Sequence, residues 1–204
     1  MRAKYAALAV LLLTVGQLAV AVFIPGLERF EGKAFGARLV AYPIMMLVVP
    51  AGWWLMNRRP KGGAGERPRV PWTAFTLIML PFLIDVTGNT FDLYDTVDWF
   101  DDALHFGNWA LLCGGIGLLI RDGLPQTWHR VMMITGIGAI LAIAWEIGEW
   151  YTFIRHGTEL DTAYTDTLGD VTLGTIGALL AGFVVGRRSR GATAMTDVRA
   201  MRAG

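Results

Sequence analysis

Residues 131–150 read VMMITGIGAILAIAWEIGEW, an apolar stretch that carries no charge until Glu146 and Glu149. An α-helix needs about 20 mainly apolar residues to cross the hydrocarbon core of a bilayer. The stretch therefore predicts a membrane-spanning helix, Val131–Trp150, that places two carboxylates near one of its ends.

Five other stretches have the same character, and composition agrees with them. Hydrophobic residues make up 54% of the 204 residues, charged residues only 17%, and the mean hydropathy is +0.45, whereas a soluble domain is about one quarter charged. We predict an all-α polytopic membrane helix bundle forming a single transmembrane domain, with a linker over 57–70 and a basic tail over 187–204. The other predicted spans are Tyr5–Ile24, Leu39–Met56, Pro71–Val86, Ala103–Ile120 and Val171–Val185.

The residue inventory excludes several classes of protein. Lys and Arg total 18 against 17 Asp and Glu, so no basic domain is present to bind nucleic acid. The single cysteine, Cys113, forms no internal disulfide and lies within a predicted span. Ser189, the only serine, lies in the tail. These positions weigh against covalent catalysis by serine or cysteine.

The distribution of Lys and Arg predicts the orientation, because cytoplasmic loops of membrane proteins carry an excess of both. Fourteen of the 18 fall at the N-terminus, in the loops after the second and fourth spans, and in the tail. Both termini and the linker are therefore expected to be cytoplasmic. The remaining four are Arg29, Lys33, Arg38 and Arg155.

The first predicted helix has two interpretations. Arg2 and Lys4 followed by an apolar run resemble a secretory signal, with Ala19-Val20-Ala21 as a cleavage site. The apolar run continues through Ile24, which favours a retained helix.

Acidic residues gather on the opposite side, where 14 of the 17 lie in predicted outer loops or toward outer span ends. The first cluster runs over residues 92–105, with an acid every three to four residues and aromatic residues between them. As a helix it would lie in the membrane interface, but a solvated acidic loop is the favoured interpretation of Asp92, Asp95 and Asp98. Asp101 and Asp102 precede His105 by one helical turn.

Two more acidic clusters follow. Glu146 and Glu149 share one helix face, and their alternative role is structural hydrogen bonding. Asp166 and Asp170 form an i, i+4 pair, of which an N-cap explains one. Asp85, near the outer end of the third span, is either a further contributor or an interfacial residue facing water.

The predicted starts of the fourth and sixth spans and the end of the fifth lie at the same outer surface. Helix packing there would gather several carboxylates around one imidazole, which calls for a cation to neutralise them. We predict a divalent metal site of unidentified metal, since oxygen ligands suit Mg²⁺, Mn²⁺ or Ca²⁺ and a histidine also admits Zn²⁺ or iron. The candidate catalytic bases are His105 and Glu146, and the candidate ligands are Asp101, Asp102, Glu149, Asp166 and Asp170.

Three segments carry a resemblance: Asp101-Asp102-Ala-Leu-His105-Phe106, Glu146-x-x-Glu149-Trp150, and Tyr164-x-Asp166-Thr167-x-x-Asp170 with Gly177 beyond. Over residues 95–182 the chain resembles the YjdF-like family of bacterial inner-membrane proteins and, more distantly, the VanZ-like family. Asp102, Glu149 and Gly174 stand where VanZ-like members commonly have Lys, Gln and Asn. The resemblance implies a multi-pass protein of the bacterial cytoplasmic membrane with a common site.

Two functions are compatible with this site. The first is a hydrolase or transferase that acts on a phosphate or acyl bond of a lipid or cell-envelope head group, with membrane lipids as its surroundings. The second is a non-enzymatic binder or transporter of a cation or cationic small molecule. No ionisable residue marks the cytoplasmic half of a predicted span, so binding at one face is better supported than transport.

Overall fold

The computed structural model describes residues 2–24, 26–27, 30, 33–58, 68–152, 154–156 and 158–187, and no strand occurs among them. Six helices in this part of the chain are long and apolar enough to cross a membrane, which confirms the predicted all-α, six-span architecture. They are α1 (Arg2–Phe23), α2 (Phe35–Asn57), α3 (Trp72–Thr90), α5 (Phe100–Ile120), α6 (Thr127–Thr152) and α7 (Ala163–Arg187). The predicted linker 57–70 and tail 187–204 lie mostly outside the described residues.

Large apolar side chains on the outer helix faces suit contact with lipid. Leu12, Val40 and Ile140 are 70%, 64% and 68% exposed, and each belongs to a different long helix. Monomeric soluble proteins rarely expose apolar patches larger than a few hundred Å². An α-helix satisfies its main-chain hydrogen bonds within its own segment. It can therefore cross a bilayer with an apolar face exposed to lipid.

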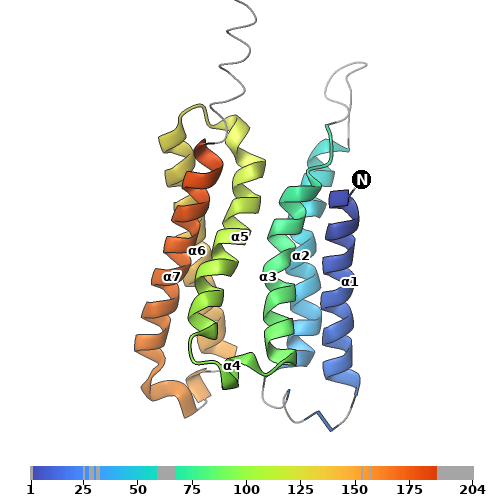
Figure 1. Cartoon of the computed structure of the whole chain (residues 1–204), viewed down its shortest axis with the longest axis vertical. Coiled ribbons are helices and arrows are strands. Elements are labelled where there is room, and N and C mark those ends of the chain that lie inside the picture. Colours follow the sequence, from blue (N-terminus) through green and yellow to red (C-terminus); the bar gives the residue numbers. More distant parts are fainter. Residues whose placement is uncertain are drawn as a thin grey trace, which may run out of the picture. The chain divides into compact units, whose positions relative to one another are not determined.

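The chain divides into two compact units, 1–104 and 105–204, and each is described by itself. The first contains α1, α2 and α3 and the short helix α4 (Leu93–Thr96) (Figure 1). Ala7 and Val10 of α1 pack with Met46 of α2 and Met79 of α3 to form its core. In the same unit, Gln17 and Thr87 are joined by a 3.1 Å hydrogen bond from the Gln17 amide, which ties α1 to α3 inside the apolar zone.

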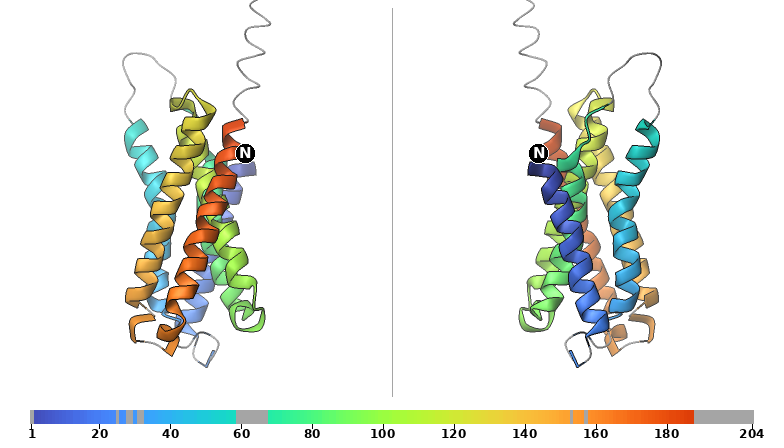
Figure 2. Two further views of the ribbon diagram at one scale, coloured as in Figure 1. Left: turned by 90° about the vertical axis from the view of Figure 1, so that its left-hand side faces the viewer. Right: turned by 90° about the vertical axis from the view of Figure 1, so that its right-hand side faces the viewer.

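The second unit consists of α5 from His105 onward, α6 and α7, with α6 and α7 side by side along their length (Figure 2). Three short 3-10 helices complete its turns: η2 (Arg121–Gly123), η3 (Ile154–His156) and η4 (Thr158–Asp161). Small residues let the long helices approach closely. A Cβ added at Gly138 would lie 2.2 Å from the Cβ of Ala178, so glycine is required at that contact.

Each long helix extends beyond its predicted span at one end or both, and α3 and α7 are two examples. The third span was expected to end at Val86, but α3 continues to Thr90; the sixth was expected from Val171, but α7 begins at Ala163. Polar side chains at these ends bond to the helix's own carbonyls, as Thr90 Oγ1 does to Val86 O at 2.8 Å. A span predicted from hydropathy ends at such polar residues, whereas the helix itself continues through them.

The acidic stretch after α3 is not one interfacial helix. Asp92 has a positive φ of 59°, and Val97 is extended, so only the four residues of α4 are helical between them. A left-handed residue interrupts the α-helical hydrogen-bond pattern. The helix that carries His105 therefore begins at Phe100.

Candidate metal centre

The candidate centre lies at the end of the second unit where α5 begins, α6 ends and α7 begins (Figure 1). His105 is on the second turn of α5, Glu146 and Glu149 are on the last turns of α6, and Asp170 is on the second turn of α7. Each helix of the unit thus contributes one titratable group or more. The sequence prediction that these three helix ends bring His105, Glu146, Glu149 and Asp170 into one region agrees with this arrangement.

His105 lies between two buried carboxylates that come from different helices. Its Nδ1 is 3.9 Å from Oε1 of Glu146, and its Nε2 is 3.6 Å from Oδ1 of Asp170. The three side chains are only 10%, 6% and 5% exposed. Buried ionisable groups in a membrane-spanning segment are costly, so they mark a candidate functional site.

His105, Glu146 and Glu149 fit a metal ion. Each offers one ligand atom, and the three atoms lie within 4.8 Å of one another. Two ligand atoms on opposite sides of an ion are about 4.2 Å apart when each is about 2.1 Å from it. The 3.9 Å between His105 Nδ1 and Glu146 Oε1 falls within that span, and small movements of the side chains would complete the group.

The other predicted ligands have different surroundings. Asp101 is half-buried one turn before His105 on α5, and one of its oxygens lies within 4.8 Å of a His105 ring nitrogen. Asp102 and Asp166 are exposed, and neither belongs to a group of candidate ligands found among the described residues. The second cluster and Asp170 of the third therefore converge on His105, whereas Asp102 and Asp166 are exposed and belong to neither group.

Glycines on α7 set the distance between Asp170 and His105. A Cβ at Gly177 would lie 2.2 Å from the main-chain oxygen of Phe106, so α5 and α7 are in backbone contact there. One turn nearer the centre, Gly174 accommodates the indole of Trp109, which a Cβ would meet at 2.6 Å. These α7 glycines are therefore packing residues, and they hold Asp170 beside His105.

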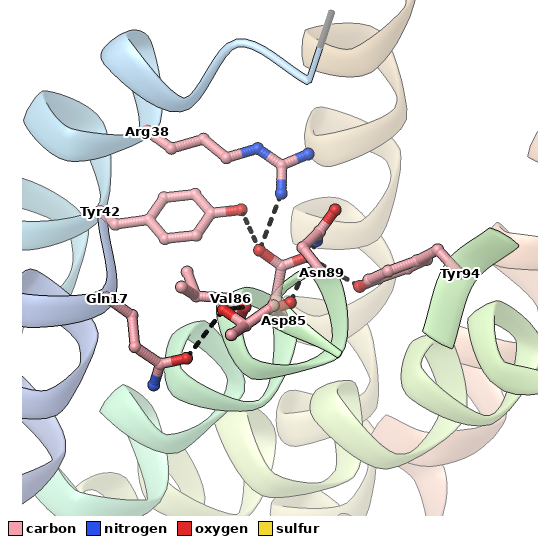
Figure 3. Close-up of polar contacts among 8 residues, drawn as sticks. Gln17, Arg38, Tyr42, Asp85, Val86, Asn89 and Tyr94 are labelled. Carbon is pink, nitrogen blue, oxygen red and sulfur yellow. Dashed lines mark hydrogen bonds and ion pairs between the residues drawn. The ribbon is translucent and has the colours of Figure 1, made fainter. Parts of the chain in front are cut away.

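A separate polar cluster occupies the first unit and explains Asp85 (Figure 3). Its Oδ2 accepts hydrogen bonds from Arg38 Nη1 at 3.0 Å and Tyr42 OH at 2.7 Å, and its Oδ1 accepts one from Tyr94 OH at 2.7 Å. Asp85 therefore joins α2, α3 and α4. Sequence reasoning missed these partners, although Arg38 and Tyr42 are four apart and so share one helix face, which is a detectable signal.

Two side chains outside the spans have shifted pKa values. Burial, reinforced by the negative charge of Asp85, raises the pKa of Tyr94. The hydrogen bond from Lys33 lowers the pKa of Asp95, and the same ammonium lies 3.7 Å from Asp92 Oδ1. Asp92 and Asp95 thus form ion pairs with Lys33, so solvation alone does not describe this part of the acidic stretch.

Comparison with known proteins defines the family. Residues 7–191 match the family model described as Predicted membrane protein (DUF2238). Searches of curated proteins and of solved structures found no match. Because the match spans most of the chain and the six long apolar helices agree with the description, the chain belongs to the DUF2238 family of predicted membrane proteins.

Proposed function

We propose that His105, Glu146 and Glu149 bind a divalent metal ion, and that this centre hydrolyses or transfers a phosphate or acyl group of a lipid or cell-envelope head group. The observation that carries the proposal is the imidazole of His105 between buried carboxylates of two other helices, at 3.9 and 3.6 Å. A neutral His105 with three carboxylates has three negative charges. A divalent cation would offset two of these charges, and burial in an apolar surrounding makes that compensation favourable.

The location of the centre supports a head-group substrate. It lies at the ends of three spans, where a lipid head group would lie beside it. The excess of Lys and Arg on the opposite side predicts that this end faces outward from a bacterial cytoplasmic membrane. The likeness to YjdF-like inner-membrane proteins agrees with that location.

The roles of the side chains follow from their positions. A bound divalent ion would supply Lewis acidity and lower the pKa of a water molecule. Glu146 would hold it through Oε1, the atom that faces His105 Nδ1, and its second oxygen would accept the proton of the attacking water or hydroxyl. Glu149, which is half-buried nearer the helix end, would complete the ligand group on the side where substrate enters.

Metal content tests the binding step. We expect inductively coupled plasma mass spectrometry to find near-stoichiometric metal in detergent-purified protein, and to find it lost from Glu146→Gln/Glu149→Gln. The matched control is Asp122→Asn/Asp161→Asn, which removes two exposed carboxylates outside the centre and should keep the metal. Wild-type protein that binds no ion after incubation with Mg²⁺, Mn²⁺, Zn²⁺ or Fe²⁺ would overturn the proposal.

The single variant Glu146→Gln separates an enzyme from a cation binder. Its amide oxygen still ligates but accepts no proton, so metal should persist while turnover of head groups in vesicles of inner-membrane lipid disappears. Mass spectrometry of the lipids would report released or transferred groups. Wild-type protein that binds metal but alters no lipid or lipid-linked envelope precursor would favour the binder.

A further inference from the structure

The two ring nitrogens of His105 face different helices, and this gives the carboxylates different tasks. Nδ1 faces Glu146 of α6, and Nε2 faces Asp170 of α7. A neutral imidazole has one N–H donor and one lone pair. If one nitrogen binds an ion, the other is a donor, and its carboxylate partner fixes the orientation of the ring.

The α7 side of His105 is held by close helix packing. Asp170 has a short side chain that is 5% exposed, and its helix is in backbone contact with α5 at Gly177. Its 3.6 Å separation from Nε2 is the shorter of the two, although still longer than a hydrogen bond. Contacts of this kind commonly tighten when a ligand arrives.

The α6 side offers what an ion requires. Glu146 and Glu149 bring two longer carboxylates to the same imidazole, and Glu149 is the more exposed of the two. Glu146 and Glu149 approach His105 from one helix with long side chains that can adjust to an ion, whereas Asp170, like Asp101 on the other side of the group, has a shorter side chain. The longer pair suits a ligand group, and the shorter Asp170 suits an orienting partner.

We propose that Asp170 is a positioning residue that accepts the Nε2–H of His105 and presents Nδ1 to a metal ion between Glu146 and Glu149. The inference rests on the proposed metal centre and states which ring nitrogen of His105 binds the ion. The sequence suggested Asp170 as a metal ligand. In this inference Asp170 instead orients His105, which is the ligand.

Scalar coupling between the metal and the ring identifies the bound nitrogen. The protein would be labelled with ¹⁵N-histidine and loaded with ¹¹³Cd²⁺, and the His105 signals would be assigned by their loss in His105→Gln. Only His129 and His156 add further histidine signals. We expect coupling to Nδ1 of His105. Coupling to Nε2 would overturn the inference, because the ion would then lie on the side of Asp101 and Asp170, but metal binding by His105 itself would remain. Absence of Cd²⁺ binding would overturn both.

Substitution of Asp170 distinguishes an orienting carboxylate from a ligand. Asp170→Asn should keep a full equivalent of Cd²⁺ and the Nδ1 coupling, with affinity lower by about 10–100-fold. The matched control is Asp166→Asn, one turn earlier on α7 and exposed, which should leave affinity unchanged. Complete loss of Cd²⁺ from folded Asp170→Asn, as in Glu146→Gln/Glu149→Gln, would show that Asp170 is a ligand.

A glycine pair tests the closely packed α7 side without changing a polar group. Gly177→Ala forces α7 away from α5, because its Cβ would lie 2.2 Å from Phe106 O, so it should weaken Cd²⁺ binding in the same direction as Asp170→Asn. Gly169→Ala, beside Asp170 and with nothing within 4 Å of the added Cβ, should bind as wild type. Equal affinities for both glycine variants would contradict the proposed importance of the α5–α7 contact.

Discussion

At the scale of single residues, Arg130 is a buried charged side chain whose hydrogen-bond partners are main-chain oxygens of the same unit. It is only 7% exposed, and its guanidinium donates to these oxygens. Nε bonds to Arg121 O at 3.0 Å and to Leu124 O at 2.6 Å, and Nη1 bonds to Gly186 O at 3.4 Å. One side chain thus ties the turn between α5 and α6 to the end of α7.

Replacement of Arg130 should therefore destabilise the second unit. We expect Arg130→Ala to lower the free energy of unfolding by about 2–4 kcal/mol, because buried carbonyls lose their donors. Arg130→Lys should restore little, since an ammonium lacks the planar fork that reaches several oxygens. Thermal unfolding in detergent measures both; a lysine variant as stable as wild type would contradict the role of the fork.

Tyr94 should show an unusual pH dependence. Its raised pKa means that its proton, and the hydrogen bond to Asp85, are fully present below the ordinary tyrosine pKa of about 10 and are lost only as the pH rises through the higher value. We expect Tyr94→Phe to lose the same stability at about pH 6 as at about pH 9.

Tyrosinate absorbance gives the complementary measurement for Tyr94. As the pH rises past about 10, wild type and Tyr94→Phe should gain tyrosinate absorbance equally while the protein remains folded. Extra absorbance from wild type near the ordinary pKa would show that Tyr94 is neither buried nor held by Asp85.

At the scale of elements, helix packing in the second unit depends on which faces carry glycine. A Cβ at Gly138 would meet the Cβ of Ala178 at 2.2 Å and Sγ of Cys113 at 2.7 Å, so α5, α6 and α7 meet there. Gly136, on an exposed face of the same helix, has nothing within 4 Å.

The two α6 glycines should respond differently to alanine. We expect Gly138→Ala to cost about 1–3 kcal/mol through overpacking. Gly136→Ala should stay within about 1 kcal/mol of wild type, because it adds a methyl group in open space and lowers backbone entropy. Thermal unfolding of the pair in detergent measures the difference, and equal stabilities would contradict the close three-helix contact.

At the scale of the whole molecule, six spans put both ends of the chain on one side of the membrane, and the distribution of Lys and Arg predicts that this side is cytoplasmic. The predicted outer side then contains the turn before α5 and the loop between α6 and α7. The only native cysteine, Cys113, is fully buried and gives a low labelling background.

Engineered cysteines would test this topology. In intact spheroplasts, a membrane-impermeant maleimide should label Trp99→Cys and Leu160→Cys, which replace exposed residues at the predicted outer side. It should label Gly123→Cys, in the turn between α5 and α6, only after lysis. The reverse pattern would invert the topology and place the proposed metal centre at the cytoplasmic side.

The sequence by itself determined the helical class, the number of spans and the main site candidates. Apolar length requires spanning helices, and carboxylates beside an imidazole at three span ends are costly enough to be conspicuous. His105, Glu146, Glu149 and Asp170 were identifiable in this way because each interrupts or borders an apolar run.

Only the tertiary structure decided which acids converge. Asp102 follows Asp101 directly, and Asp166 precedes Asp170 by one turn, yet burial separates the members of each pair. The rotation of each helix about its own axis decides which member of each pair is buried. Close contacts between helices, such as that of Gly177 with Phe106, fix this rotation. The partners of Asp85 likewise come from α2 and α4, so no local pattern contains them all.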